Sequence, residues 1–179
     1  MRVISGTLGG RKFYPDKLSA TRPTTDFAKT ALFNILNNVF DFQEISFLDL
    51  FSGTGSISYE FASRGSSRIV AVEKDEKCIA FIKKHIEEWK IDAIDLIKSD
   101  VFRFLDNAHE KFDVIFAGPP YALEHIESLP EKIFKQNLLK DGGWFILETD
   151  PHHNFETHPH FFRNTNYGQT NFHFFMKKG

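Results

Sequence analysis

Three acidic residues, Asp49, Glu73 and Asp100, stand at or near the ends of successive predicted strands. Parallel strands end at one edge of a sheet, where nucleoside ligands bind. Glu73 comes 20 residues after Gly53, a spacing at which an acid can accept hydrogen bonds from both ribose hydroxyls. Asp100 is placed to accept from an adenine amino group while Val101 contacts the ring. Glu73 or Asp100 alone also suits a helix N-cap, but the three acids together indicate an adenosyl ligand.

A turn with two glycines follows the first of these strands, where residues 47–56 read Phe-Leu-Asp-Leu-Phe-Ser-Gly-Thr-Gly-Ser. Small residues in such a turn let backbone N–H groups approach a ligand closely. Ser58 stands at the third glycine of the dinucleotide-binding pattern, and the lysine of a phosphate-binding loop is absent. The carboxylate of Asp49 repels a pyrophosphate but suits a ligand with an amine and a sulfonium. The turn therefore disfavours a dehydrogenase.

A rigid turn is predicted at the end of the fourth strand, which reads Ala117-Gly118-Pro119-Pro120-Tyr121. Two consecutive prolines restrict the backbone, so that its carbonyl groups are expected to point into the cleft. Tyr121 is placed to stack on a planar base. Taken alone, the string also fits an ordinary strand-ending turn with an exposed tyrosine.

The positive charge of the chain is concentrated at its start. Residues 1–30 hold six basic and two acidic residues, whereas the remaining 149 hold 16 basic and 22 acidic ones, and the net charge is −2. This asymmetry is typical of a polyanion-binding arm on an acidic body, although a solvated basic surface has the same composition. The basic residues of the arm are Arg2, Arg11, Lys12, Lys17, Arg22 and Lys29.

Alternating apolar runs and helical patterns predict an α/β fold with a mostly parallel, Rossmann-like sheet and an antiparallel C-terminal strand. The expected strands are 45–51, 68–73, 95–99, 112–117 and 144–149, with a terminal antiparallel pair at 161–163 and 171–177. The expected helices are 56–64, 75–89, 101–107 and 123–139.

The front of the chain is predicted to form a β-hairpin and a helix that pack on this body. The hairpin strands are 2–8 and 11–14 around Gly9 and Gly10, and a helix begins near Pro23 with Thr24, Thr25 and Asp26 as capping candidates. We expect a single domain over 1–179, in which 1–22 is the arm, 23–40 the leading helix and 45–179 the Rossmann-like core.

Composition narrows the class of protein. The chain has 179 residues, of which 41% are hydrophobic and 26% charged, as in a globular domain with a core of its own. No apolar run is long enough to span a bilayer, and the N-terminus lacks the apolar stretch of a secretory signal. One cysteine, Cys78, excludes an internal disulfide, and no zinc pattern is present. We expect a cytoplasmic protein without a metal or a membrane partner.

These motifs together resemble the RsmD family of class I S-adenosylmethionine-dependent methyltransferases. The body motifs are Asp49 to Gly55, Glu73, Asp100 and Pro119-Pro120-Tyr121. The front is more specific, and its matching segments are residues 1–6, 10–12, 21–26 and 31–36. Members of this family methylate the N2 amine of a guanine in small-subunit (16S) ribosomal RNA. The cofactor is converted to S-adenosylhomocysteine in this reaction.

The resemblance implies a role for each matching position. Gly118, Pro119, Pro120 and Tyr121 would form the catalytic turn. Ribosomal RNA would be the partner, in a small-subunit ribonucleoprotein, and the enzyme would be a monomer. Asp49, Phe51, Gly53 and Gly55 would hold the methionine end of the cofactor, Glu73 its ribose, and Asp100 with Val101 its adenine, while Arg2, Arg11, Lys12, Arg22 and Thr24 would meet the RNA.

One position departs from the family pattern, because Gly118 stands where an Asp or Asn usually precedes the two prolines. That side chain normally accepts a hydrogen bond from the target amine. Backbone carbonyls, above all that of Pro119, remain as acceptors, and proximity and orientation can contribute about 7–11 kcal/mol. We expect activity, at a reduced level.

Two other functions remain open on the sequence alone. The first is a SAM-binding, RNA-binding protein with impaired catalysis, which would account for a glycine at position 118 in place of the usual Asp or Asn. An adenine-N6 DNA methyltransferase uses a similar Pro-Pro-aromatic turn, but it needs a target-recognition insertion for which 179 residues leave no space.

Overall fold

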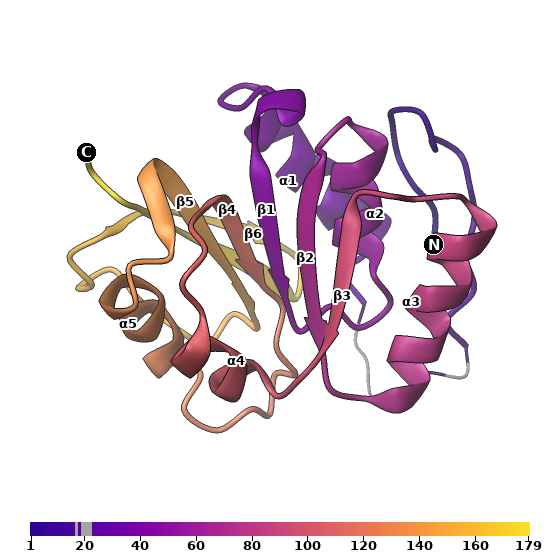
Figure 1. The fold of residues 1–179 in the computed structure, drawn as a ribbon. Coiled ribbons are helices and arrows are strands. Elements are labelled where there is room, and N and C mark those ends of the chain that lie inside the picture. The colour runs from indigo at the N-terminus through magenta and orange to yellow at the C-terminus, as the bar shows by residue number, and fades with distance from the viewer. Residues whose placement is uncertain (17, 19–22) are drawn as a thin grey trace.

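A seven-stranded sheet forms the centre of the computed structural model, which describes residues 1–16, 18 and 23–179 (Figure 1). The strand order is β3-β2-β1-β4-β5-β7-β6. The strands are β1 (Ser46–Leu50), β2 (Arg68–Glu73), β3 (Ile94–Lys98), β4 (Phe112–Ala117), β5 (Leu139–Thr149), β6 (Phe161–Tyr167) and β7 (Thr170–Met176).

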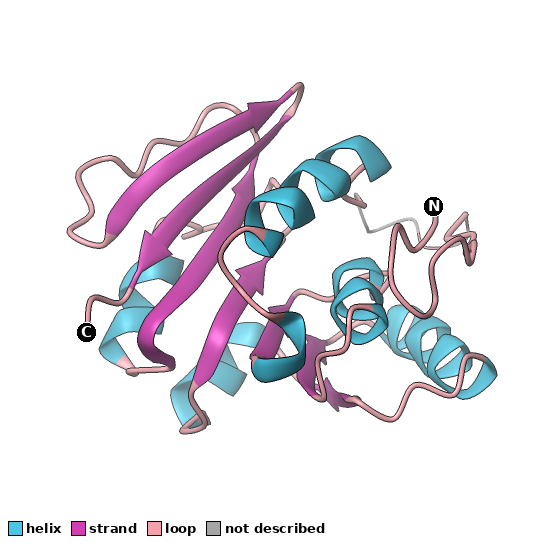
Figure 2. Ribbon diagram, turned by 90° about the horizontal axis from the view of Figure 1, so that it is seen from above, coloured by secondary structure: helices cyan, strands magenta, loops and turns pink. Residues whose placement is uncertain are grey.

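Helices cover both faces of this sheet (Figure 2). Buried side chains of α1, α2 and α3 form one hydrophobic cluster, and those of α4 and α5 form a second cluster on the other face. Within the described residues, no helix combines the length and apolar character needed to cross a membrane. The helices are α1 (Asp26–Asn37), α2 (Ser56–Ser63), α3 (Glu76–Glu88), α4 (Val101–Asn107), α5 (Ser128–Lys135) and the short 3-10 helix η1 (Phe42–Glu44).

The direction of the strands determines where a ligand can bind. Strands β1 to β5 pair in parallel, and β7 pairs antiparallel with both β5 and β6. The chain moves outward in one direction from β1 to β2 and β3, then returns to the other side of β1 with β4. Such a reversal of strand order leaves a crevice at the carboxyl ends of β1 and β4. The predicted α/β fold with an antiparallel C-terminal strand is confirmed.

The C-terminal half differs from the prediction in its boundaries. The helix predicted over 123–139 is shorter, since α5 spans Ser128–Lys135 and Asn137 adopts a left-handed backbone (φ 54°) that ends it. Leu139 then pairs with Phe112, so that β5 begins five residues earlier than predicted. Strand β6 is longer than predicted because it pairs with β7 up to the turn at Gly168.

At the front, the expected antiparallel turn is present, but its two strands are reduced to one bridge between Arg2 and Lys12. The amides of residues 4, 5, 7 and 8 donate hydrogen bonds to α2 instead of to a partner strand. The Leu8 amide donates to Ser63 Oγ at 2.9 Å, and the backbone at Gly6 passes so close that an added Cβ would lie 2.0 Å from the Ser63 carbonyl oxygen. Only glycine fits there, and its φ of +83° is also one that favours glycine.

A buried carboxylate joins this front segment to α1 and α2. Glu60 accepts hydrogen bonds from the amides of Ile4 (2.8 Å) and Ser5 (3.1 Å) and from Arg64 Nε (2.9 Å). Lys29 Nζ of α1 lies 3.6 Å from the same carboxylate, and both side chains are fully buried. Burial is the main cause that lowers the pKa of Lys29. The buried ammonium of Lys29 is stabilised by this carboxylate and by hydrogen bonds that it donates to the Arg2 carbonyl oxygen (2.6 Å) and to Ser56 Oγ (3.0 Å).

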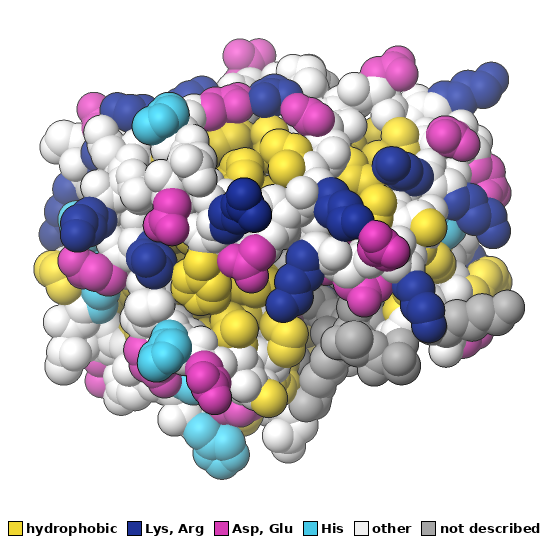
Figure 3. Space-filling view, turned by 60° about the horizontal axis from the view of Figure 1, so that its bottom comes forward, with side chains coloured by type: hydrophobic (Ala, Val, Ile, Leu, Met, Phe, Trp, Pro, Cys, Tyr) yellow, Lys and Arg dark blue, Asp and Glu magenta, His cyan; other side chains and the backbone are white. Residues whose placement is uncertain are grey.

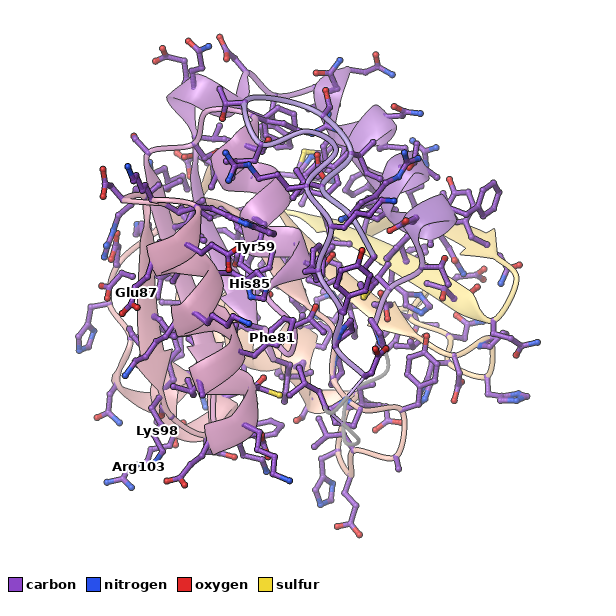
Figure 4. The ribbon with its side chains drawn as sticks, turned by 90° about the vertical axis from the view of Figure 1, so that its right-hand side faces the viewer. Tyr59, Phe81, His85, Glu87, Lys98 and Arg103 are labelled. Atoms are coloured by element: carbon purple, nitrogen blue, oxygen red, sulfur yellow. The ribbon has the colours of Figure 1, made fainter. Side chains whose placement is uncertain are left out.

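Next to this pair, aromatic side chains fill the space between α2 and α3. Figure 4 shows Tyr59, Phe81 and His85 side by side in this layer. The ring centroids of Phe81 and His85 are 4.4 Å apart, and those of Tyr59 and His85 are 5.8 Å apart. Phe13 packs edge-on against Tyr59 at 5.4 Å, so the front segment closes this part of the core.

We predict that Glu60→Ala lowers the free energy of unfolding by about 3–5 kcal/mol, because Lys29 is left buried without its carboxylate and two amides lose their acceptor. Urea denaturation followed by circular dichroism measures this change. Glu87→Ala on the exposed face of α3 is the control and is expected to stay within about 0.5 kcal/mol. A loss for Glu60→Ala below about 1 kcal/mol would contradict the assignment.

Candidate active site

A cleft opens at the carboxyl edge of the sheet, where the reversal of strand order predicts one. The loops that follow β1 to β4 line it, together with the segment that leads into α1. Figure 3 views the molecule from the side of this edge, where hydrophobic side chains are surrounded by acidic and basic ones.

The glycine-containing turn after β1 forms one wall of the cleft. Phe51, Gly53 and Gly55 have φ angles of 60°, 56° and 82°, so that the backbone here is left-handed at three positions. Gly55 precedes the first residue of α2 and packs against Tyr59, whose ring carbon would lie 2.6 Å from an added Cβ. The turn thus brings backbone and the N-terminus of α2 to the cleft, which Gly53, Thr54 and Ser56 line.

Asp49 lies at the base of this turn with a side chain that is 1% exposed. Ser58 Oγ donates a hydrogen bond of 2.6 Å to Asp49 Oδ2. Burial raises the pKa of Asp49 to about 7, against the opposing effect of the Ser58 hydrogen bond. Such a buried carboxylate attracts a cation strongly, since a cationic partner would restore the stabilisation that water supplies elsewhere.

Glu73, the last residue of β2, holds the turn in place from the neighbouring strand. The Gly53 amide donates to Glu73 Oε2 at 2.7 Å, while the amides of Lys74 and Asp75 donate to Oε1 at 2.9 and 3.0 Å. The carboxylate therefore lies at the rim of the cleft in a defined orientation. Since a carboxylate has about four acceptor positions and three amides donate here, one position is left for a ribose hydroxyl.

Asp100 combines the two roles that the sequence suggests. Its side chain caps α4 by accepting from the Arg103 amide at 3.1 Å, and it also lines the cleft. Val101 follows with its side chain buried in the cleft wall. The N-cap interpretation and the ligand-binding interpretation are thus compatible at this position.

The turn after β4 lies beside the turn after β1, because Leu50 pairs with Ala117, and Gly118, Pro119 and Pro120 all line the cleft. A Cβ added to Gly118 would lie 3.1 Å from Cε1 of the Phe116 ring. The Tyr121 hydroxyl turns toward Glu148, at 3.5 Å from Oε2. The rigid turn expected from the sequence is present, and Phe116 occupies part of the space beside its first residue.

Sequence reasoning missed Glu148, the next-to-last residue of β5. It lines the cleft, and its side chain is 3% exposed. The hydroxyl of Thr24, which is also buried, donates to Glu148 Oε1. The signal in the sequence was a single acid within the otherwise apolar run that ends β5, at the same edge as the three predicted carboxylates.

Among the basic residues of the front that the structure describes, none lines the cleft. Arg2 lies near the start of α1, with Nε 3.8 Å from Asp26. Arg11 lies over Trp89 at 5.9 Å, directly after the C-terminal end of α3 and so toward the amino edge of the sheet. Lys12 is exposed between them, Lys29 is buried against Glu60, and Arg22 lies outside the described residues.

No metal centre is evident in the part of the chain that the structure describes, where no three His, Cys, Asp or Glu side chains are grouped to hold an ion.

Comparison with known proteins identifies the family. The family described as "Conserved hypothetical protein 95" matches residues 1–176. The chain is 32% identical over 154 residues to "Putative rRNA methyltransferase YlbH" of Bacillus subtilis, covering 84% of this chain and 83% of that protein. It is 30% identical over 148 residues to "Ribosomal RNA small subunit methyltransferase D" of Escherichia coli, covering 83% and 71%.

Solved structures agree on the fold. A "putative methyltransferase yhhF" from Escherichia coli superposes with a TM-score of 0.87 and 25% identity, over 99% of this chain and 98% of that one. The Thermus thermophilus 16S rRNA N2 G1207 methyltransferase RsmC, solved with AdoMet and guanosine, shares the fold with a TM-score of 0.69 and 21% identity, over 88% of this chain and 45% of that one. The matched family, the relatives and the cleft agree: this chain belongs to the RsmD family and is a class I methyltransferase that uses S-adenosylmethionine.

Proposed function

We propose that this enzyme methylates the N2 amine of a guanine in small-subunit (16S) ribosomal RNA. The observation that carries the proposal is the cleft itself, in which carboxylates at three strand ends face a rigid Gly-Pro-Pro turn. The names of the relatives, which are ribosomal RNA methyltransferases, support this substrate class. S-adenosylmethionine supplies an electrophilic methyl group on a sulfonium.

The cofactor is proposed to lie along the strand ends. Asp49 would attract the positive ammonium group of its methionine end, while the left-handed turn at Phe51, Gly53 and Gly55 leaves room for close backbone contact. Glu73 would accept from the ribose hydroxyls. At the far end of the cleft, Asp100 would accept from the adenine amino group, and Val101 would pack on its ring.

The target base is proposed to enter opposite the cofactor, out of its stack, because a stacked base cannot reach the sulfonium. The backbone carbonyl oxygens of Gly118, Pro119 and Pro120 would lie near the amine of the base and accept its hydrogen bonds. Tyr121 would lie against the face of the base. With no side chain at Gly118, orientation by these groups carries much of the rate enhancement.

The RNA is proposed to extend from the cleft over the front segment. Arg2, Arg11, Lys12 and Arg22 would contact phosphates, and Thr24 would position the segment at the mouth of the cleft. Because Arg11 lies far from the cleft, such a surface fits a large folded substrate better than a short strand, which favours an assembled small subunit. We further propose that the enzyme acts as a monomer in the cytoplasm, where such subunits are assembled.

We predict that the wild-type protein transfers labelled methyl groups from S-adenosylmethionine to unmodified small ribosomal subunits, and that the product is N2-methylguanosine. Nucleoside analysis by mass spectrometry identifies the product. N6-methyladenosine in DNA would point to the other enzyme class. If the protein binds the cofactor but transfers no methyl group to any subunit preparation, the proposed activity is wrong. That result would identify a SAM-binding, RNA-binding protein without catalysis.

We predict that cofactor binding weakens as the pH falls through about 7, since burial raises the pKa of Asp49 to about 7 and only its charged form attracts the cofactor. From pH 8 to pH 6, the affinity for S-adenosylhomocysteine should fall about tenfold. Asp49→Asn should reduce the affinity at pH 8 by about 10- to 100-fold and remove this pH dependence. Isothermal titration calorimetry measures both.

The matched control is Asp92→Asn, an exposed aspartate before β3, which should bind like the wild type. Because the folded chain disfavours a charged Asp49, Asp49→Asn should also raise the thermal unfolding midpoint of the ligand-free protein at pH 8. Tight, pH-independent binding by the wild type would contradict the role of Asp49.

We predict that the double variant Arg11→Glu/Lys12→Glu binds small subunits more weakly and with a smaller dependence on salt, because each lost phosphate contact reduces the salt slope by about one. Filter binding at several salt concentrations measures this. The control is Lys83→Glu/Lys84→Glu, the same charge change on exposed positions of α3. Equal effects of both pairs would show a general charge effect and not an RNA-binding face.

A further inference from the structure

Glu148 is a buried carboxylate in the cleft to which the cofactor-binding scheme gives no role. It comes from β5, one residue before the strand ends, and it is 3% exposed. It lines the cleft together with the turn that follows β4.

The register of the sheet places Glu148 beside the position that lacks an acid. Ala117 of β4 pairs with Leu147 of β5 in a parallel ladder. One residue further along each strand, Gly118 and Glu148 therefore come level at the carboxyl edge, and both line the cleft. The acid that is absent from the turn is thus present on the adjacent strand.

The surroundings of Glu148 orient its carboxylate. Thr24 donates its hydroxyl to Oε1 from one side, and the Tyr121 hydroxyl lies 3.5 Å from Oε2 on the other. Two contacts from different segments restrict the side chain to one direction. The carboxylate is thereby held at the wall of the cleft, beside the turn at Gly118.

We propose that Glu148 accepts a hydrogen bond from the N2 amine of the target guanine and so replaces the acid missing at position 118; this rests on the proposed function. The lone pair of N2 forms the new N–C bond as the methyl–sulfur bond breaks and its electrons return to sulfur. N2 then loses one proton, which passes to the Glu148 carboxylate and on to water. The amine must be held with its lone pair toward the methyl group, and an acceptor on its N–H achieves this.

The same geometry accounts for the glycine. The space beside Gly118 is shared with the Phe116 ring, which an added Cβ would approach to 3.1 Å. A side chain at 118 therefore fits only when this ring shifts by a few tenths of an ångström. In this scheme the Phe116 ring occupies the space beside position 118, and Glu148 of β5 accepts the hydrogen bond from the target amine.

The test compares Glu148→Gln with wild type on unmodified small subunits at saturating S-adenosylmethionine, under single-turnover conditions. Loss of a charged acceptor should lower the methyl-transfer rate by about 10- to 100-fold. The dissociation constant for S-adenosylhomocysteine, measured by calorimetry, should change by less than about threefold, because Glu148 faces the target base in this scheme. Glu156→Gln, an exposed glutamate in the loop after β5, is the matched control.

A second variant separates catalysis from structure. Gly118→Asp combined with Glu148→Gln restores a carboxylate at the catalytic turn and should recover at least about tenfold of the lost rate. A Glu148→Gln rate within about threefold of wild type would overturn the proposal while leaving the proposed function intact. So would a loss of cofactor affinity equal to the loss of rate, since that shows a collapsed cleft. A wild type that makes no N2-methylguanosine overturns both.

Discussion

The buried pair of Lys29 and Glu60 connects the front of the chain to the body, and the shape of the cleft depends on it. The Glu60 carboxylate binds the amides of residues 4 and 5, and Lys29 brings α1 against α2. The position of α1 in turn sets where the preceding segment runs, and with it the Thr24 hydroxyl at Glu148. A buried charge pair can fix the relative position of the segments that it joins even where its net contribution to the free energy of unfolding is small.

The cleft itself combines two carboxylates that the fold stabilises differently. Asp49 sits under the glycine-containing turn, where burial raises its pKa to about 7. Glu148 lies two strands away on β5, between hydroxyls from two other segments. One faces the proposed cationic cofactor and the other the proposed amine. Asp49 carries a desolvation cost that a cationic ligand would offset, as is common where stability is sacrificed for function.

Much of the site was predictable because it is local in the sequence. Asp49, Gly53 and Gly55 lie in one strand-turn-helix unit, and the turn at Gly118–Tyr121 is short and restricted by proline. Glu73 and Asp100 lie at strand ends, and parallel strands necessarily bring their carboxyl ends to one edge. The alternation of apolar and helical segments likewise predicts the sheet. Gly6, by contrast, looked like part of a hairpin strand, since nothing nearby in sequence reveals its contact with Ser63.

The sequence by itself therefore determined the fold class, the strand-end acids and the cofactor class, since these follow from local pattern and from the symmetry of a parallel sheet. Only the tertiary structure decided which residues share a wall of the cleft. Glu148 lies 30 residues from Gly118 along the chain and comes beside it through the register of β4 and β5. Lys29 counted as a free charge in the sequence, but packing places it against Glu60. Contacts between distant segments depend on packing and register, which no single stretch of sequence encodes.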